Sequence, residues 1–179
     1  MKKIFPILVA GIFILTGCTS MKFSSFSRSL DTVNEVELNR YLGTWYEYAR
    51  LDVPFEKGMT KTQANYSLMD PDKEGRPRIR VVNSGMKKGK FKKAKAKAVI
   101  PDPDEPGRIQ VSFFGPFYSD YNIIALDTAD YQWSLVSGSS RDYLWVLSRK
   151  PQLDPAVFAK LKAIAGNYGF DTSALIFPQ

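Results

Sequence analysis

Hydrophobic and polar residues alternate along most of the chain, which is typical of β-strands. Between residues 43 and 149, short segments with an apolar residue at every second position recur, separated by clusters of Gly, Pro and Asp. Eight such segments are present, and they contain in turn Trp45, Tyr66, Val81, Ala96, Val111, Ile123, Leu135 and Trp145. The pattern predicts an all-β fold, an eight-stranded up-and-down antiparallel barrel.

One helix is predicted after the last of these strands. Asp154 suits the N-cap, Pro155 suits the first helical position, and Gly169 is placed to end the helix. Apolar residues follow at helical spacing: Val157, Phe158, Leu161, Ile164, Ala165 and Tyr168. We therefore expect this helix to pack against the side of the barrel, followed by a short last strand over 174–177.

The N-terminal segment has the pattern of an export signal. Lys2 and Lys3 precede an apolar run, residues 4–15. A membrane-spanning helix needs about twenty apolar residues, so this run predicts a signal peptide. It ends in Leu15-Thr16-Gly17-Cys18, which resembles the bacterial lipobox. Cys18 is then the lipid attachment site, and the alternative is an ordinary signal peptide with an incidental cysteine.

These features predict three parts of the chain. Residues 1–17 are a lipoprotein signal peptide, residues 18–33 are the lipidated cysteine and a flexible Ser/Thr-rich tether, and residues 34–179 are the folded domain. Thr19, not Asp, follows the cysteine, and by resemblance to the usual sorting pattern this favours the outer membrane of a bacterial cell envelope.

Composition excludes much of conventional catalysis. The 179 residues include no His and one Cys, so Ser-His-Asp and Cys-His catalysis, imidazole–zinc sites and an intrachain disulfide are absent. No Ser lies in a G-x-S-x-G elbow. We expect a protein that is not an enzyme and needs no cofactor or metal.

Three short motifs resemble those of the lipocalin family. Gly43-Thr44-Trp45-Tyr46 is similar to the G-x-W signature of the first strand, Ala125-Leu126-Asp127 keeps the Asp of the second motif, and Trp145-Val146-Leu147-Ser148-Arg149 resembles the third. The wider similarity, over residues 31–178, is to the bacterial outer-membrane branch, which is similar to apolipoprotein D. The resemblance implies a barrel that holds a fatty acid or lysophospholipid for lipid storage, transport or envelope maintenance.

Alternation also predicts which side chains face the barrel interior. The expected ligand-contacting residues are Tyr66, Val81, Asn83, Ala96, Val111, Phe113, Tyr121, Tyr143 and Trp145. Small side chains at Ala94, Ala96 and Ala98 leave room along one wall, and tyrosine hydroxyls and the Asn83 amide suit a polar headgroup. The alternative is a filled core without a cavity.

Two further expectations concern the first strand. Trp45 and Arg149 are predicted to close one barrel end through a cation–π contact, a structural role. Trp45, Glu47 and Ala49 are expected to share the inner face. A buried, unpaired Glu47 would have a raised pKa or find a partner, a Tyr hydroxyl or Arg149. The alternative, a catalytic acid, is disfavoured because no second carboxylate or nucleophile lies at a plausible spacing. Phe55 is expected at the rim as an apolar gate.

Positive charge is concentrated in one segment. The net charge is +7, and seven lysines lie close together: Lys87, Lys88, Lys90, Lys92, Lys93, Lys95 and Lys97. The segment is either a solvated strand face or a surface attracted to anionic lipid phosphates. Nucleic-acid binding is excluded by the export signal.

The alternative functions are an envelope lipid-modifying enzyme on a lipocalin-like barrel and a filled-barrel interaction lipoprotein. The oligomeric state is open, a homodimer included.

Overall fold

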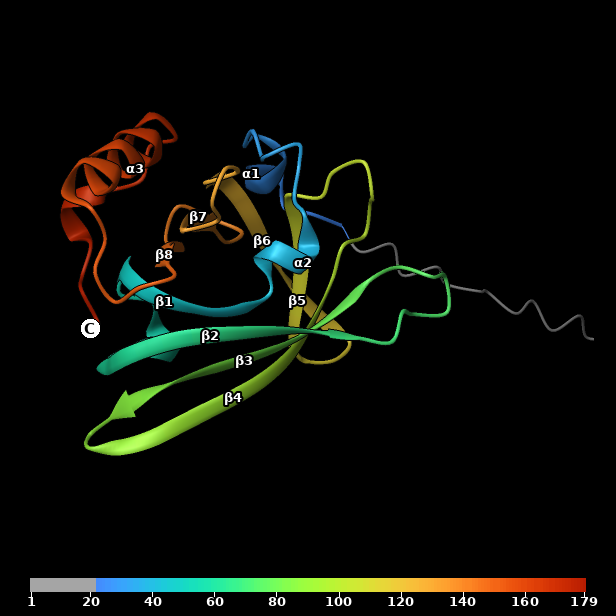
Figure 1. The fold of residues 1–179 in the computed structure, drawn as a ribbon, viewed down its shortest axis with the longest axis horizontal. Helices are drawn as coiled ribbons and strands as arrows, with labels where there is room; N and C mark the ends of the chain where they lie inside the picture. The colour runs from blue at the N-terminus through green and yellow to red at the C-terminus, as the bar shows by residue number, and fades with distance from the viewer. Residues whose placement is uncertain (1–21) are drawn as a thin grey trace, which may run out of the picture.

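The barrel is closed and antiparallel throughout. A computed structural model describes residues 22–179, in which each strand pairs with the next and β8 pairs with β1 (Figure 1). The strands are β1 (Gly43–Arg50), β2 (Met59–Met69), β3 (Arg78–Lys87), β4 (Lys90–Val99), β5 (Arg108–Phe114), β6 (Phe117–Leu126), β7 (Trp133–Ser137) and β8 (Leu144–Ser148). The predicted eight-stranded up-and-down barrel is confirmed.

The predicted C-terminal helix is also confirmed. It is α3 (Pro155–Asn167), and the Asp154 side chain accepts hydrogen bonds from the backbone N–H groups of Ala156 and Val157. Its buried residues, Leu161 and Ala165, pack on the outside of the barrel. The shorter helices are α1 (Ser25–Arg28), α2 (Leu38–Tyr41), η1 (Pro54–Glu56) and η2 (Thr172–Ala174). Among residues 22–179, no helix has the length and hydropathy needed to cross a bilayer.

Two hydrophobic clusters lie on opposite sides of the barrel wall. The inner one contains Trp45 and Leu147, and the outer one lies under α3 and contains Ala49 and Val146. The expectation that Trp45, Glu47 and Ala49 share one face is wrong for Ala49. The register of β1 against β8 shifts between Glu47 and Ala49, and this bulge turns Ala49 outward.

The segment before the barrel is packed over part of its length. Ser27 is fully buried, and its hydroxyl donates to the Asp120 carboxylate at 2.7 Å. The Arg108 guanidinium donates to the Leu30 carbonyl at 2.7 Å, and the backbone N–H of Val33 donates to the Ile123 carbonyl at 3.0 Å. The predicted flexible tether therefore does not extend to residue 33. The Asp120 carboxylate, which accepts from the Ser27 hydroxyl and the Ser24 backbone N–H, helps to hold this part of the chain on the barrel. The predicted signal peptide and Cys18 lie outside the described residues.

The chain ends against the first strand. A short last strand was expected over 174–177, but in the structure Ile176 forms only an isolated antiparallel bridge with Arg50. Beyond it, the side-chain amide of Gln179 donates to the Glu47 carbonyl. The regular pairing of β1 with β2 runs only from Gly43 to Tyr46, so these C-terminal residues provide partners where β1 has left β2.

The wall of the barrel is uneven. The β3–β4 hairpin is long and continuously paired, and it extends away from the rest of the barrel (Figure 1). By contrast, β4 pairs with β5 at only three positions, Lys97, Ala98 and Val99. In the described structure, residues 90–96 of β4 thus have no strand partner on the β5 side. We call this place the β4–β5 seam.

Candidate functional site: the barrel interior and its open end

One end of the barrel is closed by Trp45 and Arg149. The Trp45 indole is fully buried, and the Arg149 guanidinium lies 3.9 Å from the centre of its ring. The same guanidinium donates to the carbonyls of Arg40, Thr44 and Tyr131. The geometry of the predicted cation–π contact is present, and the additional hydrogen bonds tie three chain segments together.

Gly43 shows why the first motif begins with glycine. Its φ is +91°, a backbone conformation that side chains other than hydrogen disfavour. A Cβ atom placed there would lie 3.4 Å from the Arg149 guanidinium. The glycine thus allows the strand to start beside the arginine that covers Trp45.

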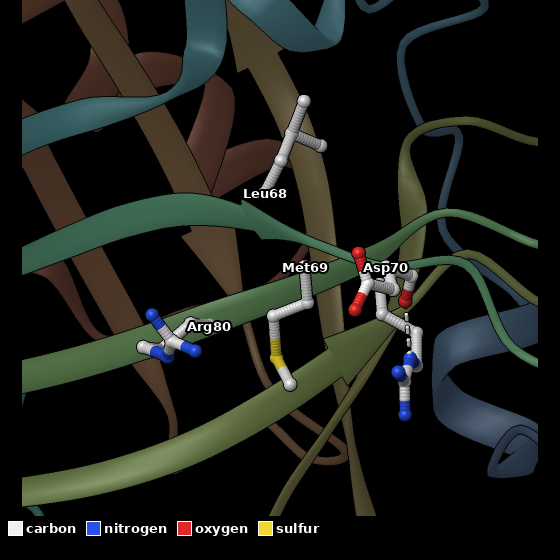
Figure 2. A pocket seen from close by; sticks show the side chains of 5 residues that line it. Leu68, Met69, Asp70 and Arg80 are labelled. Carbon is white, nitrogen blue, oxygen red and sulfur yellow. Dashed lines mark hydrogen bonds between the residues drawn. The ribbon is translucent and has the colours of Figure 1, made fainter.

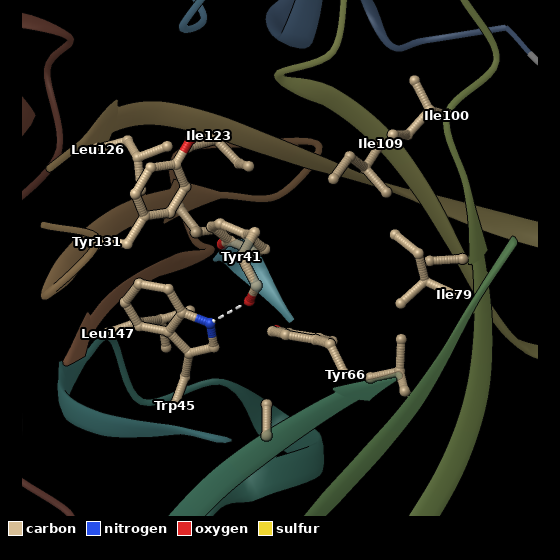
Figure 3. Close-up of a cluster of buried hydrophobic side chains, with 14 residues drawn as sticks. Tyr41, Trp45, Tyr66, Ile79, Ile100, Ile109, Ile123, Leu126, Tyr131 and Leu147 are labelled. Carbon is tan, nitrogen blue, oxygen red and sulfur yellow. Dashed lines mark hydrogen bonds between the residues drawn. The ribbon is translucent and has the colours of Figure 1, made fainter. Parts of the chain in front are cut away.

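Above this end, three tyrosines form a floor inside the barrel. The Tyr41 hydroxyl lies 2.7 Å from that of Tyr121, which lies 3.1 Å from that of Tyr66. The Trp45 indole N–H donates to the Tyr41 carbonyl at 2.7 Å (Figure 3). Burial raises the pKa of Tyr41 to about 12 and the pKa values of Tyr66 and Tyr121 further, so all three are neutral at physiological pH.

The floor leaves little empty space. The cavity beside the three tyrosines has a volume of about 10 Å³, and it is also lined by Ile79, Val81, Ala98, Ile109 and Val111. That volume is about the room needed for one water molecule. The space around the three tyrosines is therefore nearly filled. Of the tyrosines expected to contact a ligand, Tyr66 and Tyr121 hydrogen-bond through their hydroxyls to each other, and Tyr121 also to Tyr41.

The interior becomes more open toward the other end. Along the inner face of β4, Ala98 is 2% exposed, Ala96 is half-buried and Ala94 is exposed. Across the seam Val111 is half-buried, and Phe113 is 39% exposed. Small and apolar side chains on this face thus become more exposed from the tyrosine floor to the mouth. Asn83, paired with Ala94, places an amide oxygen in this wall that has no hydrogen-bond partner among the described residues.

An aromatic group lies at the mouth. Phe55, on the loop between β1 and β2, is 58% exposed, and its ring centre is 6.3 Å from that of Tyr143 and 6.4 Å from that of Trp145. Tyr143 and Trp145 are themselves 6.3 Å apart. Phe55 therefore occupies the rim position expected of a gate, and Tyr143 is part of this rim group.

A buried charged cluster lies beside the rim group, and the sequence analysis missed most of it. The fully buried Arg50 guanidinium is 3.4 Å from the Glu47 carboxylate and 3.5 Å from that of Glu56. Trp145 donates its indole N–H to Glu56 at 3.1 Å. Burial and the neighbouring Glu56 raise the pKa of Glu47 to about 8, and burial raises that of Glu56.

This cluster corrects two expectations about Glu47. Its partner is Arg50, not a tyrosine or Arg149, because the bulge in β1 brings the guanidinium to the side of Glu47. A second carboxylate, Glu56, does lie beside it, supplied by the loop after β1. Charged residues at positions 47, 50 and 56 gave no periodic signal, since bulges and loops do not follow strand alternation.

The second motif has a local structural role. The Asp127 carboxylate accepts hydrogen bonds from the backbone N–H groups of Asp130 and Gln132. It thereby caps the turn between β6 and β7. Within residues 22–179, no group of three or more carboxylate, imidazole or thiol side chains is arranged as a metal site.

A separate cleft of about 370 Å³ lies at the end of the β2–β3 hairpin, lined by Leu68, Met69, Asp70, Arg78 and Arg80. Figure 2 shows Leu68 on one side of β2 and Met69 on the other. Arg78 donates to the Asp70 carbonyl at 2.6 Å. The cleft lies at the opposite end of β2 and β3 from the rim group, so it is not part of the mouth.

Comparisons with known proteins identify relatives of the whole chain. Residues 36–179 match the family described as lipocalin-like domain. The outer membrane lipoprotein Blc of Escherichia coli K12 is 39% identical over 99% of this chain and 97% of its own length. The protein of that name from Vibrio cholerae is 39% identical over 100% and 99%. Rat apolipoprotein D is 30% identical over 93% of this chain and 88% of its own length.

Solved structures show the same fold. Insecticyanin from the tobacco hornworm superposes with a TM-score of 0.65 at 20% sequence identity, covering 84% of each chain. Lobster apocrustacyanin A1 superposes with a TM-score of 0.62 at 21% identity, covering 79% of this chain and 78% of its own.

Proposed function

Because this chain belongs to the lipocalin family, whose members are generally binding proteins, we propose that it holds a single-chain lipid in the upper half of its barrel. The ligand is a fatty acid or a lysophospholipid, with its tail inside and its polar end at the mouth. The bacterial outer membrane is the location indicated by the relatives that match over nearly the whole chain. Attachment there through a lipid on Cys18 is part of the proposal.

The observation that carries the proposal is the gradient of exposure along the inner wall. Ala98 is 2% exposed and packed against the tyrosine floor, whereas Ala94 is exposed. The facing residues Val81, Val111 and Phe113 are apolar, so water in this space is poorly hydrogen-bonded and easily displaced by a hydrocarbon chain. In this proposal the tail ends above the hydrogen-bonded hydroxyls of Tyr41, Tyr66 and Tyr121.

Partial burial of a tail is sufficient for useful affinity. Each buried methylene contributes about 0.8 kcal/mol, and micromolar binding corresponds to about 8 kcal/mol. Roughly a dozen methylenes therefore supply this affinity and leave a margin for the entropy of ordering the chain. The polar end of such a lipid stays at the rim, near Phe55 and the Glu56–Arg50 cluster.

The nearly filled space around the three tyrosines favours one alternative, an interaction lipoprotein without a ligand. The test is Ala96→Trp, which places an indole in the middle of the proposed tail path, with Lys95→Trp as the matched control on the opposite face of β4. The full chain is released from nanodiscs for native mass spectrometry after incubation with palmitate or a lysophospholipid. We expect bound lipid mass on the parent and on Lys95→Trp, and none on Ala96→Trp.

Equal binding by both variants contradicts the proposed site, and no bound lipid on the parent supports the filled barrel. A lipid-modifying enzyme is tested in the same samples, since cleavage or isomerisation of the lysophospholipid changes its mass or its chromatographic retention. The two neighbouring carboxyl groups, Glu47 and Glu56, are the residues that a lipid-modifying enzyme would use. Both contact Arg50, and Glu56 also accepts from Trp145, which favours a structural role for the pair in holding the loop after β1.

A further inference from the structure

Four phenylalanines are exposed on two neighbouring hairpins at the open end. Phe114 is 81% exposed, Phe117 is 77% exposed, Phe91 is 64% exposed and Phe113 is 39% exposed. Phe114 and Phe117 face each other across the β5–β6 turn, and Phe91 lies near the β3–β4 turn. Single exposed apolar residues are common on protein surfaces, but a group of large ones marks an interaction surface.

The β3–β4 hairpin, which carries Phe91, also carries all seven lysines noted in the sequence. From residue 85 to residue 100 there are seven lysines and no Asp or Glu. Within the described part of the chain, none of the seven forms an ion pair with a carboxylate. The Lys97 ammonium lies 5.9 Å from the ring centre of Tyr118, so positive charge from β4 reaches the turn end of the β5–β6 hairpin, beside Phe117. We call the four phenylalanines and seven lysines the mouth patch.

We propose that the mouth patch docks the open end of the barrel onto an anionic lipid bilayer. Exposed phenylalanine rings gain free energy by entering the boundary between headgroups and acyl chains, and the lysine stems reach past them to the phosphates. Each lysine near an anionic membrane surface increases the equilibrium constant for docking about fivefold. Aromatic and basic side chains without acidic neighbours fit an anionic membrane better than they fit an acidic protein surface, which would leave the phenylalanines uncovered.

The length of the N-terminal segment agrees with this orientation. The Gln110 side chain donates to the Lys22 carbonyl, so the first described residue lies beside the middle of β5. Phe114 is four residues further along that strand, about 13 Å toward the mouth. The four residues from Cys18 to Lys22 span at most about 14 Å. If Cys18 carries the predicted lipid, this length is sufficient for the anchor to reach the level of Phe114 with the barrel standing mouth-down.

Docking in this way connects the barrel to the source of its ligand. The β4–β5 seam lies between the two hairpins of the mouth patch, and the exposed Ala94 lines its inner side. A single-chain lipid leaving the bilayer would thus meet the widest part of the inner wall first. The docking surface itself is independent of which lipid the barrel holds.

The proposal is tested by placing a tryptophan at the patch and measuring its contact with lipid. The full chain carrying Phe114→Trp is incorporated into vesicles that contain brominated lipid, either of phosphatidylcholine alone or with 30% phosphatidylglycerol. The matched control is Asp104→Trp, in the β4–β5 loop at the other end of the same strands. The parent chain gives the background from Trp45, Trp133 and Trp145.

We expect quenching of the added tryptophan at position 114 in vesicles with phosphatidylglycerol, several-fold weaker quenching in phosphatidylcholine alone, and none at position 104. Changing Lys90, Lys92 and Lys93 together to Gln should remove most of the effect of phosphatidylglycerol. Equal quenching at positions 104 and 114, or none at 114, overturns the proposal. Shielding of position 114 without lipid, together with a dimer in solution, assigns the patch to a second copy of the chain and also overturns it.

Lipid binding measured by native mass spectrometry on Phe114→Ser separates the two proposals. If Phe114→Ser still binds lipid but no longer docks on vesicles, the binding function stands. If the parent docks on vesicles but never carries bound lipid, only the binding function is contradicted.

Discussion

Replacing Arg149 by Met should destabilise the barrel without changing its affinity for a lipid. Methionine keeps an apolar stem over Trp45 but removes the charge that lies 3.9 Å from the ring centre. It also removes the hydrogen bonds to the carbonyls of Arg40, Thr44 and Tyr131. Three such bonds contribute about 1 kcal/mol each and a partly buried cation–π contact about 1 kcal/mol. In the variant, water replaces some of the hydrogen bonds to these carbonyls. We therefore expect the free energy of unfolding to fall by roughly 2–4 kcal/mol.

The assay is urea unfolding followed by tryptophan fluorescence, supported by the melting temperature, which should fall by roughly 5–15 °C for a domain of this size. Arg141→Met is the matched control, since Arg141 also covers an aromatic ring, that of Phe26 at 5.0 Å, but is exposed. It should lose less than about 1 kcal/mol. Equal losses in the two variants would refute the role of Arg149 as the closure of the barrel. A loss of lipid affinity at unchanged stability would place Arg149 in the ligand site.

Two further predictions concern Glu47 and the anchor. Burial raises the pKa of Glu47 to about 8, so the folded chain keeps a proton that the unfolded chain releases near pH 4.5, and the free energy of unfolding should fall as the pH rises between these values. Glu47→Gln should flatten this decline in urea titrations from pH 5 to 8.5, and an unchanged slope would assign the proton elsewhere. Cys18→Ser should abolish incorporation of radiolabelled palmitate and leave an unprocessed or soluble product, with continued labelling as the contrary result.

The sequence predicted the parts of the fold that follow regular patterns. Strand alternation located the eight strands, and helical spacing after Asp154 located α3. The contact of Trp45 with Arg149 followed from two motifs about a hundred residues apart. In each case, local chemistry agrees with the global fold, which is why pattern alone was sufficient.

The errors arose where the pattern breaks. The bulge in β1 reverses the facing of Ala49 and brings Arg50 to Glu47, and alternation carries no sign of it. Glu56 lies in a loop, so its meeting with Glu47 depends on tertiary structure. The packing of Ser27 could not be predicted from composition, because a Ser-rich segment resembles a linker, and the hydrogen bond from the Ser27 hydroxyl to the Asp120 carboxylate depends on tertiary structure.

The short pairing of β4 with β5 has a consequence for solubility. Residues 90–96 of β4 present an open strand edge, and such edges pair readily with the edges of other chains. In the segment Lys93-Ala94-Lys95-Ala96-Lys97, every second side chain is charged, and lysine on an edge strand opposes stacking of one molecule on the next. The lysines thus also act as gatekeepers against aggregation. A chain in which these lysines are neutralised needs to be handled at low concentration, and its oligomeric state compared with that of the parent, before any loss of membrane contact is interpreted.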